Sequence, residues 1–271
     1  MDPALIVAFV ALGALVGFLA GLLGIGGGMT MVPLLTLAFS RQGFAEEHVV
    51  HLAVATATAT ILFTSIASAR EHHRHGAVRW RIVGGMAPGI VVGSLVGPQV
   101  VGTMPTSILA AFFGVFVAVS ATQMLIGRKP APTRELPGSA GLFAVGGGIG
   151  LISSMVGAGG AFLSVPFMRA CNVKLRNAVA TSAAIGLPIA IAGTVGFAVA
   201  GWHASHLPPW SIGYVYVPAL LAIVVGSVIM APVGARAAHR WPVARLRHAF
   251  AVLLYVLAAY MLWKAWQSAG A

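Results

Sequence analysis

The sequence predicts an all-α integral membrane protein whose eight hydrophobic segments form two four-segment repeats, arranged as an inverted pair. Three observations lead to this prediction. First, 59% of the 271 residues are hydrophobic and only 8% are charged, whereas about a quarter of the residues in a soluble domain are charged. Second, apolar runs of about 20 residues recur, each long enough to cross a hydrocarbon core of about 30 Å. Third, the same short motifs occur in the same order in both halves.

The apolar segments follow one another with short loops between them. They cover residues 4–39, 49–69, 80–102, 105–126, 139–170, 177–200, 213–235 and 243–266. The first and the fifth are too long for one straight crossing, and glycine clusters at Gly24–Gly28 and Gly157–Gly160 interrupt them. We therefore expect the first segment of each repeat to break there and turn back as a re-entrant hairpin. Residues 4–23 alone would nevertheless make about 30 Å of helix, enough to cross.

Three matches in the same order define the repeat. The first half has "GLLGIGGGMTMVPLL" at 21–35, "AVAT" at 53–56 and "VVGS" at 91–94, and the second has "SMVGAGGAFLSVPFM" at 154–168, "AVAT" at 178–181 and "VVGS" at 224–227. These matches predict an N-terminal membrane repeat at 4–126, a cytoplasmic linker at 127–138 and a C-terminal membrane repeat at 139–267. Chance matching in a chain rich in glycine and alanine is the alternative.

Loop charge sets the orientation. If all eight segments simply crossed, the sixteen Lys and Arg residues would divide evenly between the two sides. If the fifth segment returns to the side it entered, fourteen of them share one face, which the positive-inside rule makes cytoplasmic. That face then holds the loops at 70–81, 127–138, 169–176 and 236–247. Corresponding loops of the two halves consequently lie on opposite faces, which is an inverted repeat.

Several function classes are excluded by what the chain contains. The net charge of +11 does not indicate a nucleic-acid partner, because the basic residues lie in short loops between apolar runs. Cys171 is the only cysteine and gives no disulfide or metal-site spacing. The histidines of "REHHRHGAVRWR" at 70–81 are adjacent in sequence and favour a solvated loop over a metal site. Without a nucleotide-binding "GxxxxGK" loop or a nucleophile–base–acid arrangement, we expect no cofactor, no ATP-driven pump and no enzyme.

The glycine clusters are the candidate binding site. Backbone that leaves helical geometry inside a membrane needs protein or a watery cavity around it, and a short helix resumes after each cluster, at about 29–39 and 161–170. The first N–H groups of such a helix are unpaired and carry the positive end of its dipole. Two such ends at the midplane would bind an anion without a charged side chain. The backbone amides expected to bind it are those of Gly26, Gly27, Gly28, Met29, Gly159, Gly160, Ala161 and Phe162. The alternative is that these glycines only permit tight helix packing.

Hydroxyl side chains concentrate beside the "AVAT" repeats. We expect Thr56, Thr181 and Ser182 to assist the site, with Thr56 and Thr181 as the repeat-equivalent pair. The alternative for any one threonine is that its hydroxyl bonds back to a carbonyl of its own helix.

Coupling residues are scarce in the apolar segments. All five acidic residues fall in loops or at the terminus, whereas buried carboxylates are the usual ion relays of pumps. Coupling would therefore need histidine, backbone carbonyls or protons carried by the substrate. His51 is the only histidine close to a segment's start on the face opposite the basic loops, and the alternative is that it is simply a histidine at the membrane interface.

The paired glycine–proline motifs, in a chain of eight apolar segments, resemble the TauE/SafE family, also called the sulfite exporter or TSUP family. The resemblance covers about residues 10–266, and the second copy departs from the fuller motif at Ala161, where the first has Gly28. It implies a multi-pass transporter of the bacterial-type cytoplasmic (inner) membrane. The implied partners are the lipid bilayer and a sulfur-containing anion such as sulfite, thiosulfate, a sulfonate or sulfoacetate.

The predicted function is therefore secondary transport of such an anion, with export as the predicted direction and with the anion's own gradient or the membrane potential as the driving force. A membrane potential that is negative inside favours export of an anion by about 2.3 kcal/mol per charge per 100 mV. The alternatives are a permease or channel for another small anion or a metal cation, or a non-transporting membrane assembly subunit. The sequence leaves open whether the chain forms a homo-oligomer.

Overall fold

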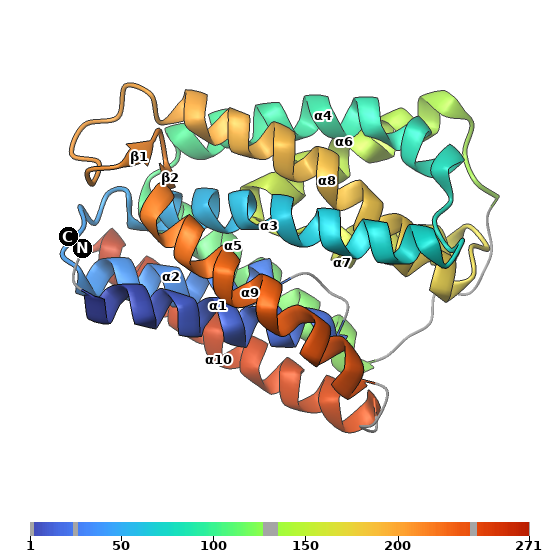
Figure 1. Cartoon of the computed structure of the whole chain (residues 1–271). Coiled ribbons are helices and arrows are strands. Elements are labelled where there is room, and N and C mark those ends of the chain that lie inside the picture. The colour runs from blue at the N-terminus through green and yellow to red at the C-terminus, as the bar shows by residue number, and fades with distance from the viewer. Residues whose placement is uncertain (1–2, 24–26, 127–134, 239–242, 271) are drawn as a thin grey trace.

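The computed structural model describes residues 3–23, 27–126, 135–238 and 243–270, and within them the chain forms ten helices and one two-stranded hairpin (Figure 1). In chain order these are α1 (Pro3–Leu23), α2 (Gly28–Arg41), α3 (Val49–Arg74), α4 (Trp80–Thr103), α5 (Thr106–Ile126), α6 (Ser139–Val156), α7 (Ala161–Ala170), α8 (Leu175–Ala200), β1 (Ser211–Ile212), β2 (Val215–Tyr216), α9 (Val217–Ala238) and α10 (Val243–Ala269). The strands pair antiparallel. The prediction of an all-helical membrane protein is confirmed.

Six of the described helices are long and apolar enough to cross a membrane: α3, α4, α5, α6, α8 and α10. The first and fifth apolar segments are each divided in two at their glycines, as expected. The arms are unequal, because α6 has 18 residues and α7 has 10, which correspond to about 27 Å and about 15 Å of helix. The segment expected from residue 213 begins as helix only at Val217, since Gly213 has a φ of 54° and residues 215–216 form a strand.

The connections between helices gather at two ends of the molecule (Figure 1). At one, which we call the cavity end, the loop after α2, the α4–α5 connection, Tyr214 and the last turns of α10 line a common cavity. At the other, the basic end, the start of α8 is hydrogen-bonded to the α3–α4 connection: Asn177 Nδ2 donates to the Ala77 carbonyl at 2.8 Å. Loops 70–81 and 169–176 therefore share an end, whereas residues 127–134 and 239–242 of the loops at 127–138 and 236–247 lie outside the described residues.

The helices that follow the two glycine breaks end at opposite ends of the molecule. Helix α2 runs into the loop at the cavity end, and α7 runs into the connection at the basic end. Each broken segment also packs along a helix of the other half, α1 on α9 and α6 on α4. Glycines make both crossings close, because a Cβ at Gly13 would overlap the Ile223 carbonyl and a Cβ at Gly146 would overlap that of Met86. Gly13 and Gly146 precede their glycine clusters by the same number of residues, so each broken segment makes a close crossing at the same distance from its break.

Cysteine labelling tests the arrangement of the two ends. Cys171 is buried, so introduced thiols stand out against a low background. Ser205 and Lys174 are both exposed, at the cavity and basic ends respectively. A membrane-impermeant maleimide added to intact cells is expected to label Ser205→Cys and to reach Lys174→Cys only after the membrane is opened. Labelling of both variants in intact cells would contradict the separation of the ends across a membrane.

Candidate functional site

The two glycine breaks meet inside the bundle. A Cβ placed on Gly28, at the start of α2, would overlap the carbonyl oxygen of Gly157 at the end of α6, and it would lie 3.2 Å from the Ala158 Cα. The two tips, which belong to helices ending at opposite ends of the molecule, are therefore in direct backbone contact. Only glycine at position 28 leaves room for this approach.

The second tip needs glycine for its backbone conformation. Gly157 ends α6 with a φ of 65°, and Gly160 precedes α7 with a φ of 75°, a region that residues with a Cβ rarely adopt. The first tip differs, since Gly27 has a φ of −62°. The requirement at Gly27 is space, because a Cβ there would overlap a methyl group of Val16. Gly26 lies outside the described residues.

Both tips present backbone donors. Among the described residues, no backbone hydrogen bond uses the N–H groups of Gly28 and Met29 at the first tip. The same holds at the second tip for Gly159, Gly160, Ala161 and Phe162. These are the N–H groups that a helix start leaves unpaired, and they carry its partial positive charge. The predicted amides of the described residues therefore have no backbone hydrogen-bond partner at the two helix starts.

Helix α3 supports the second tip with one face. The Val54 carbonyl would lie 3.0 Å from a Cβ at Gly157, and the Ile61 methyl 3.6 Å from one at Gly159. Helix α8 closes the other side, where a Cβ at Gly186 would stand 2.6 Å from the Ser65 hydroxyl and 3.5 Å from the Gly159 carbonyl. The second tip is thus held between two spanning helices.

Hydroxyl groups surround the second tip. Ser164 Oγ donates to Ser182 Oγ at 3.0 Å, and both side chains are buried. The Ser153 hydroxyl would lie 3.4 Å from a Cβ at Gly160, and Ser65 faces Gly186 as described above. The structure places Ser182 beside Ser164, whose N–H bonds to the Gly160 carbonyl one turn into α7. Ser65, Ser153 and Ser164 were not predicted, and the only signal for them in the sequence is that they fall within apolar segments.

Thr56 and Thr181 have a different placement from the one expected. The Thr56 hydroxyl accepts a hydrogen bond from the Tyr216 N–H at 3.1 Å, and the Thr181 hydroxyl accepts one from the Arg79 N–H at 3.0 Å. Tyr216 and Arg79 directly precede α9 and α4. The repeat-equivalent threonines thus satisfy equivalent helix starts. Because successive helix residues turn by about 100°, Thr56 lies on a face of α3 away from Val54 and the second tip.

The neighbouring threonines follow the alternative considered above. Thr58 Oγ1 donates to the Val54 carbonyl at 2.8 Å, and Thr60 Oγ1 donates to the Thr56 carbonyl at 2.9 Å. Both bonds return to the carbonyl four residues earlier in the same helix. Thr60, which shares a face with Thr56, is therefore engaged within α3.

Comparisons with known proteins agree with this architecture. The family model described as "Sulfite exporter TauE/SafE" matches residues 9–261. A probable membrane transporter protein of Haemophilus influenzae is 37% identical over 256 residues, which cover 93% of this chain and 96% of the relative. Similar proteins of Bacillus subtilis and Methanocaldococcus jannaschii are 29% and 26% identical, over 87% and 93% of this chain and 91% and 94% of the relatives. Both are also named probable membrane transporters. No solved structure matches the chain significantly.

The hydrogen bonds accepted by Thr56 and Thr181 lead to a prediction about stability. Thr56→Val and Thr181→Val keep the shape of the side chain but leave the buried N–H of Tyr216 and the part-buried N–H of Arg79 without an acceptor, which costs about 1–3 kcal/mol for a buried group and less for a part-buried one. Thr58→Val is the matched control, because the carbonyl it releases remains bonded within the helix. Thermal unfolding of the purified protein in detergent is expected to show a clear loss for the first two variants and a smaller one for Thr58→Val. Equal losses in all three would contradict the assigned role.

Proposed function

Because the chain belongs to the TauE/SafE family, we propose that it exports small sulfur-containing anions, such as sulfite, thiosulfate, sulfonates or sulfoacetate, across the cytoplasmic membrane. The family and the similar proteins are membrane transporters rather than enzymes, so the chain is a multi-pass membrane transporter. Its substrate class and direction of transport rest on the arguments that follow.

The contact of the two tips is the observation that carries the proposal. At each tip a helix begins inside the bundle, and its first N–H groups are unpaired. A helix N-terminus has an effective charge of about +0.5, so two of them converge on one region without a basic side chain. An oxyanion is the ligand that matches such donors, because each oxygen accepts several hydrogen bonds.

The second tip supplies most of the proposed site. Gly28 is packed against the Gly157 carbonyl, so the first tip is closed off at that point. The amides of Gly159 and Gly160 lie among hydroxyl side chains, which donate to oxyanions and adapt to their shape. Ser182 and Ser164 supply two of these hydroxyls. Thr56 and Thr181 assist indirectly, by fixing the starts of α9 and α4.

An inverted pair of membrane repeats, at 4–126 and 139–267, suits this transport site. Matching glycine crossings of α1 on α9 and of α6 on α4 support the repeat, and the opposite exits of α2 and α7 support its inversion. The seven described Lys and Arg residues at 70–81 and 169–176 lie at the basic end. The positive-inside rule assigns that end to the cytoplasm. The membrane potential then drives an anion outward from it.

The alternatives have less support. A metal cation would need several His, Cys, Asp or Glu side chains, and the described residues include no group of three or more that could hold one. A non-transporting assembly subunit has no counterpart among the similar proteins, which are named probable membrane transporters. A channel or permease for another small anion shares the donor chemistry, and a substrate screen separates it from the proposal.

Flux through proteoliposomes tests the site. Gly159→Ala adds a methyl group whose nearest neighbour is the Ile61 methyl at 3.6 Å, an ordinary contact, so the fold is expected to be unchanged. The methyl group nevertheless crowds the amides proposed to bind substrate. Sulfite flux is expected to fall by about tenfold or more, the equivalent of one hydrogen bond to a charged group. Gly148→Ala is the matched control, since a Cβ there meets nothing within 4 Å.

The same assay screens thiosulfate, a sulfonate, sulfate and acetate with the wild-type protein. Faster flux of the sulfur oxyanions than of acetate is expected. Equal sulfite flux in Gly159→Ala and Gly148→Ala, with both proteins folded, would mean that the tips serve packing alone.

A further inference from the structure

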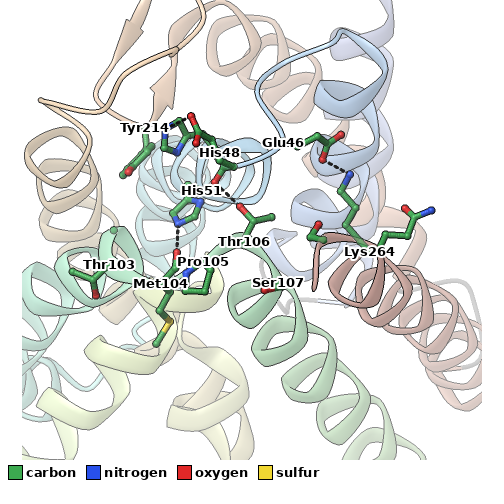
Figure 2. A pocket seen from close by; sticks show the side chains of 14 residues that line it. Glu46, His48, His51, Thr103, Met104, Pro105, Thr106, Ser107, Tyr214 and Lys264 are labelled. Carbon is green, nitrogen blue, oxygen red and sulfur yellow. Dashed lines mark hydrogen bonds and ion pairs between the residues drawn. The ribbon is translucent and has the colours of Figure 1, made fainter. Parts of the chain in front are cut away.

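A cavity of about 730 Å³ opens at the cavity end of the molecule (Figure 2). Its wall combines the loop after α2, the start of α3, the α4–α5 connection, Tyr214 and the end of α10. The ionisable side chains that line it are Glu46, Glu47, His48, His51, Tyr214 and Lys264. None of these belongs to the site at the helix breaks.

His51 has one ring nitrogen fixed by the fold. Its Nε2 lies 3.0 Å from the carbonyl oxygens of both Val101 and Met104, at the end of α4 (Figure 2). Carbonyl oxygens only accept hydrogen bonds, so Nε2 carries the hydrogen and the neutral ring presents a lone pair at Nδ1. The end of a helix also favours positive charge on a nearby ring.

The Nδ1 atom of His51 makes no hydrogen bond within the described part of the chain, although the backbone of Glu47 also lies close to this ring. His51 is 2% exposed, and its Nδ1 is buried without a hydrogen-bond partner among the described residues. The Nδ1 of His48 is in the same state, and the centroids of the two rings are 5.9 Å apart. Buried polar atoms are normally paired, so two unpaired ones beside a cavity call for a ligand that donates hydrogen.

The charges around His51 determine whether the cavity favours a cation or an anion as that ligand. Lys264 forms an ion pair with Glu46, which cancels both charges. Glu47 is not part of this ion pair, and its Oε1 lies 3.4 Å from His48 Nε2 and 3.5 Å from His206 Nδ1. Burial, and then the charge of Glu47, raise the pKa of Tyr214, so its phenol stays neutral at physiological pH. The α4–α5 connection adds no ionisable side chain to the wall. With neutral histidines the cavity therefore has a net charge of −1.

A net negative cavity repels an anion and attracts a proton or another cation. Sodium prefers oxygen ligands, whereas an imidazole lone pair binds a proton most readily near neutral pH. We propose that the cavity is a proton-binding site, in which Nδ1 of His51 accepts a proton from the external solution with His48 as the relay. A hydronium ion gives its proton to the lone pair, an N–H bond forms, and water is left. The side chain of His48 is 16% exposed, so it links the deeper ring to solvent.

The location of His51 connects this site to the helix breaks. His51 is in the first turn of α3, and Val54, three residues on, places its carbonyl against Gly157. A proton on His51 therefore changes the charge about one helical turn from the second tip. If anions leave as proposed above, an entering proton and a leaving anion both move down the membrane potential. This coupling rests on the proposed function, whereas proton binding itself does not.

Histidine NMR tests proton binding without any substrate. In His51→Gln the side-chain amide can donate to the carbonyls of α4, but it has no nitrogen that titrates. The wild-type protein, labelled with ¹⁵N in its histidine rings, is expected to show a titrating signal between about pH 5 and 8 that His51→Gln lacks. His206→Gln is the matched control, because that ring is exposed at the same end. A His51 ring that stays neutral over this range would overturn the proposal.

A second variant covers the case in which His51→Gln does not fold. His48→Gln leaves both bonds of His51 to α4 in place and removes the neighbouring ring, so it is expected to shift the His51 titration. An unchanged His51 titration in His48→Gln would overturn the role of His48.

Flux at varied external pH tests the coupling. Sulfite export from wild-type proteoliposomes is expected to change at least severalfold between external pH 6 and 8, and His51→Gln is expected to lose this dependence while His206→Gln keeps it. The same pH dependence in wild type and His51→Gln would overturn the coupling. Absence of flux for every sulfur anion in the wild type would instead overturn the proposed function and leave the NMR result standing.

Discussion

The contact between Gly28 and Gly157 imposes the constraint on which the remaining structure depends. A helix that stops inside a membrane leaves backbone groups that lipid cannot satisfy, so its end must be enclosed by protein. Here two such ends enclose one another, and α3 and α8 hold the second tip from either side. The close glycine crossings and the hydroxyls around Gly160 lie beside these two helix breaks within one bundle.

The interlocking of the halves gives this arrangement its rigidity. Helix α1 packs on α9 and α6 on α4 through glycines at equivalent positions, so neither half can move without disturbing a backbone contact with the other. The hydrogen bonds of Thr56 and Thr181 add a second matched pair at the starts of α9 and α4. Side chains that looked suited to a ligand are thereby used to join the repeats.

Charge is divided between two places with different chemistry. The helix breaks offer partial positive charge from the backbone, which suits an oxyanion. The cavity end holds the ionisable groups, of which Glu46 and Lys264 neutralise each other and Glu47 stays beside the histidines. Under the two proposals above, the transporter would bind an anion centrally without a fixed charge buried there, and the His51 ring would respond to the solution at the cavity end.

The sequence by itself determined the membrane class, the positions of the segments and the two glycine breaks, because segment length, hydropathy and glycine clusters are local properties. Its predictions of Ser182, beside an "AVAT" motif, and of the amides of Gly159 and Gly160, in a glycine cluster, remain proposals for a binding site. Only the tertiary structure decided that Gly28 rests on Gly157, that Thr56 turns away to Tyr216, and that His51 meets Tyr214 and the end of α4. These contacts join residues far apart in the chain, so periodicity and local spacing cannot predict them. The ion pair of Lys264 is an example, because its partner Glu46 lies in the other half of the chain.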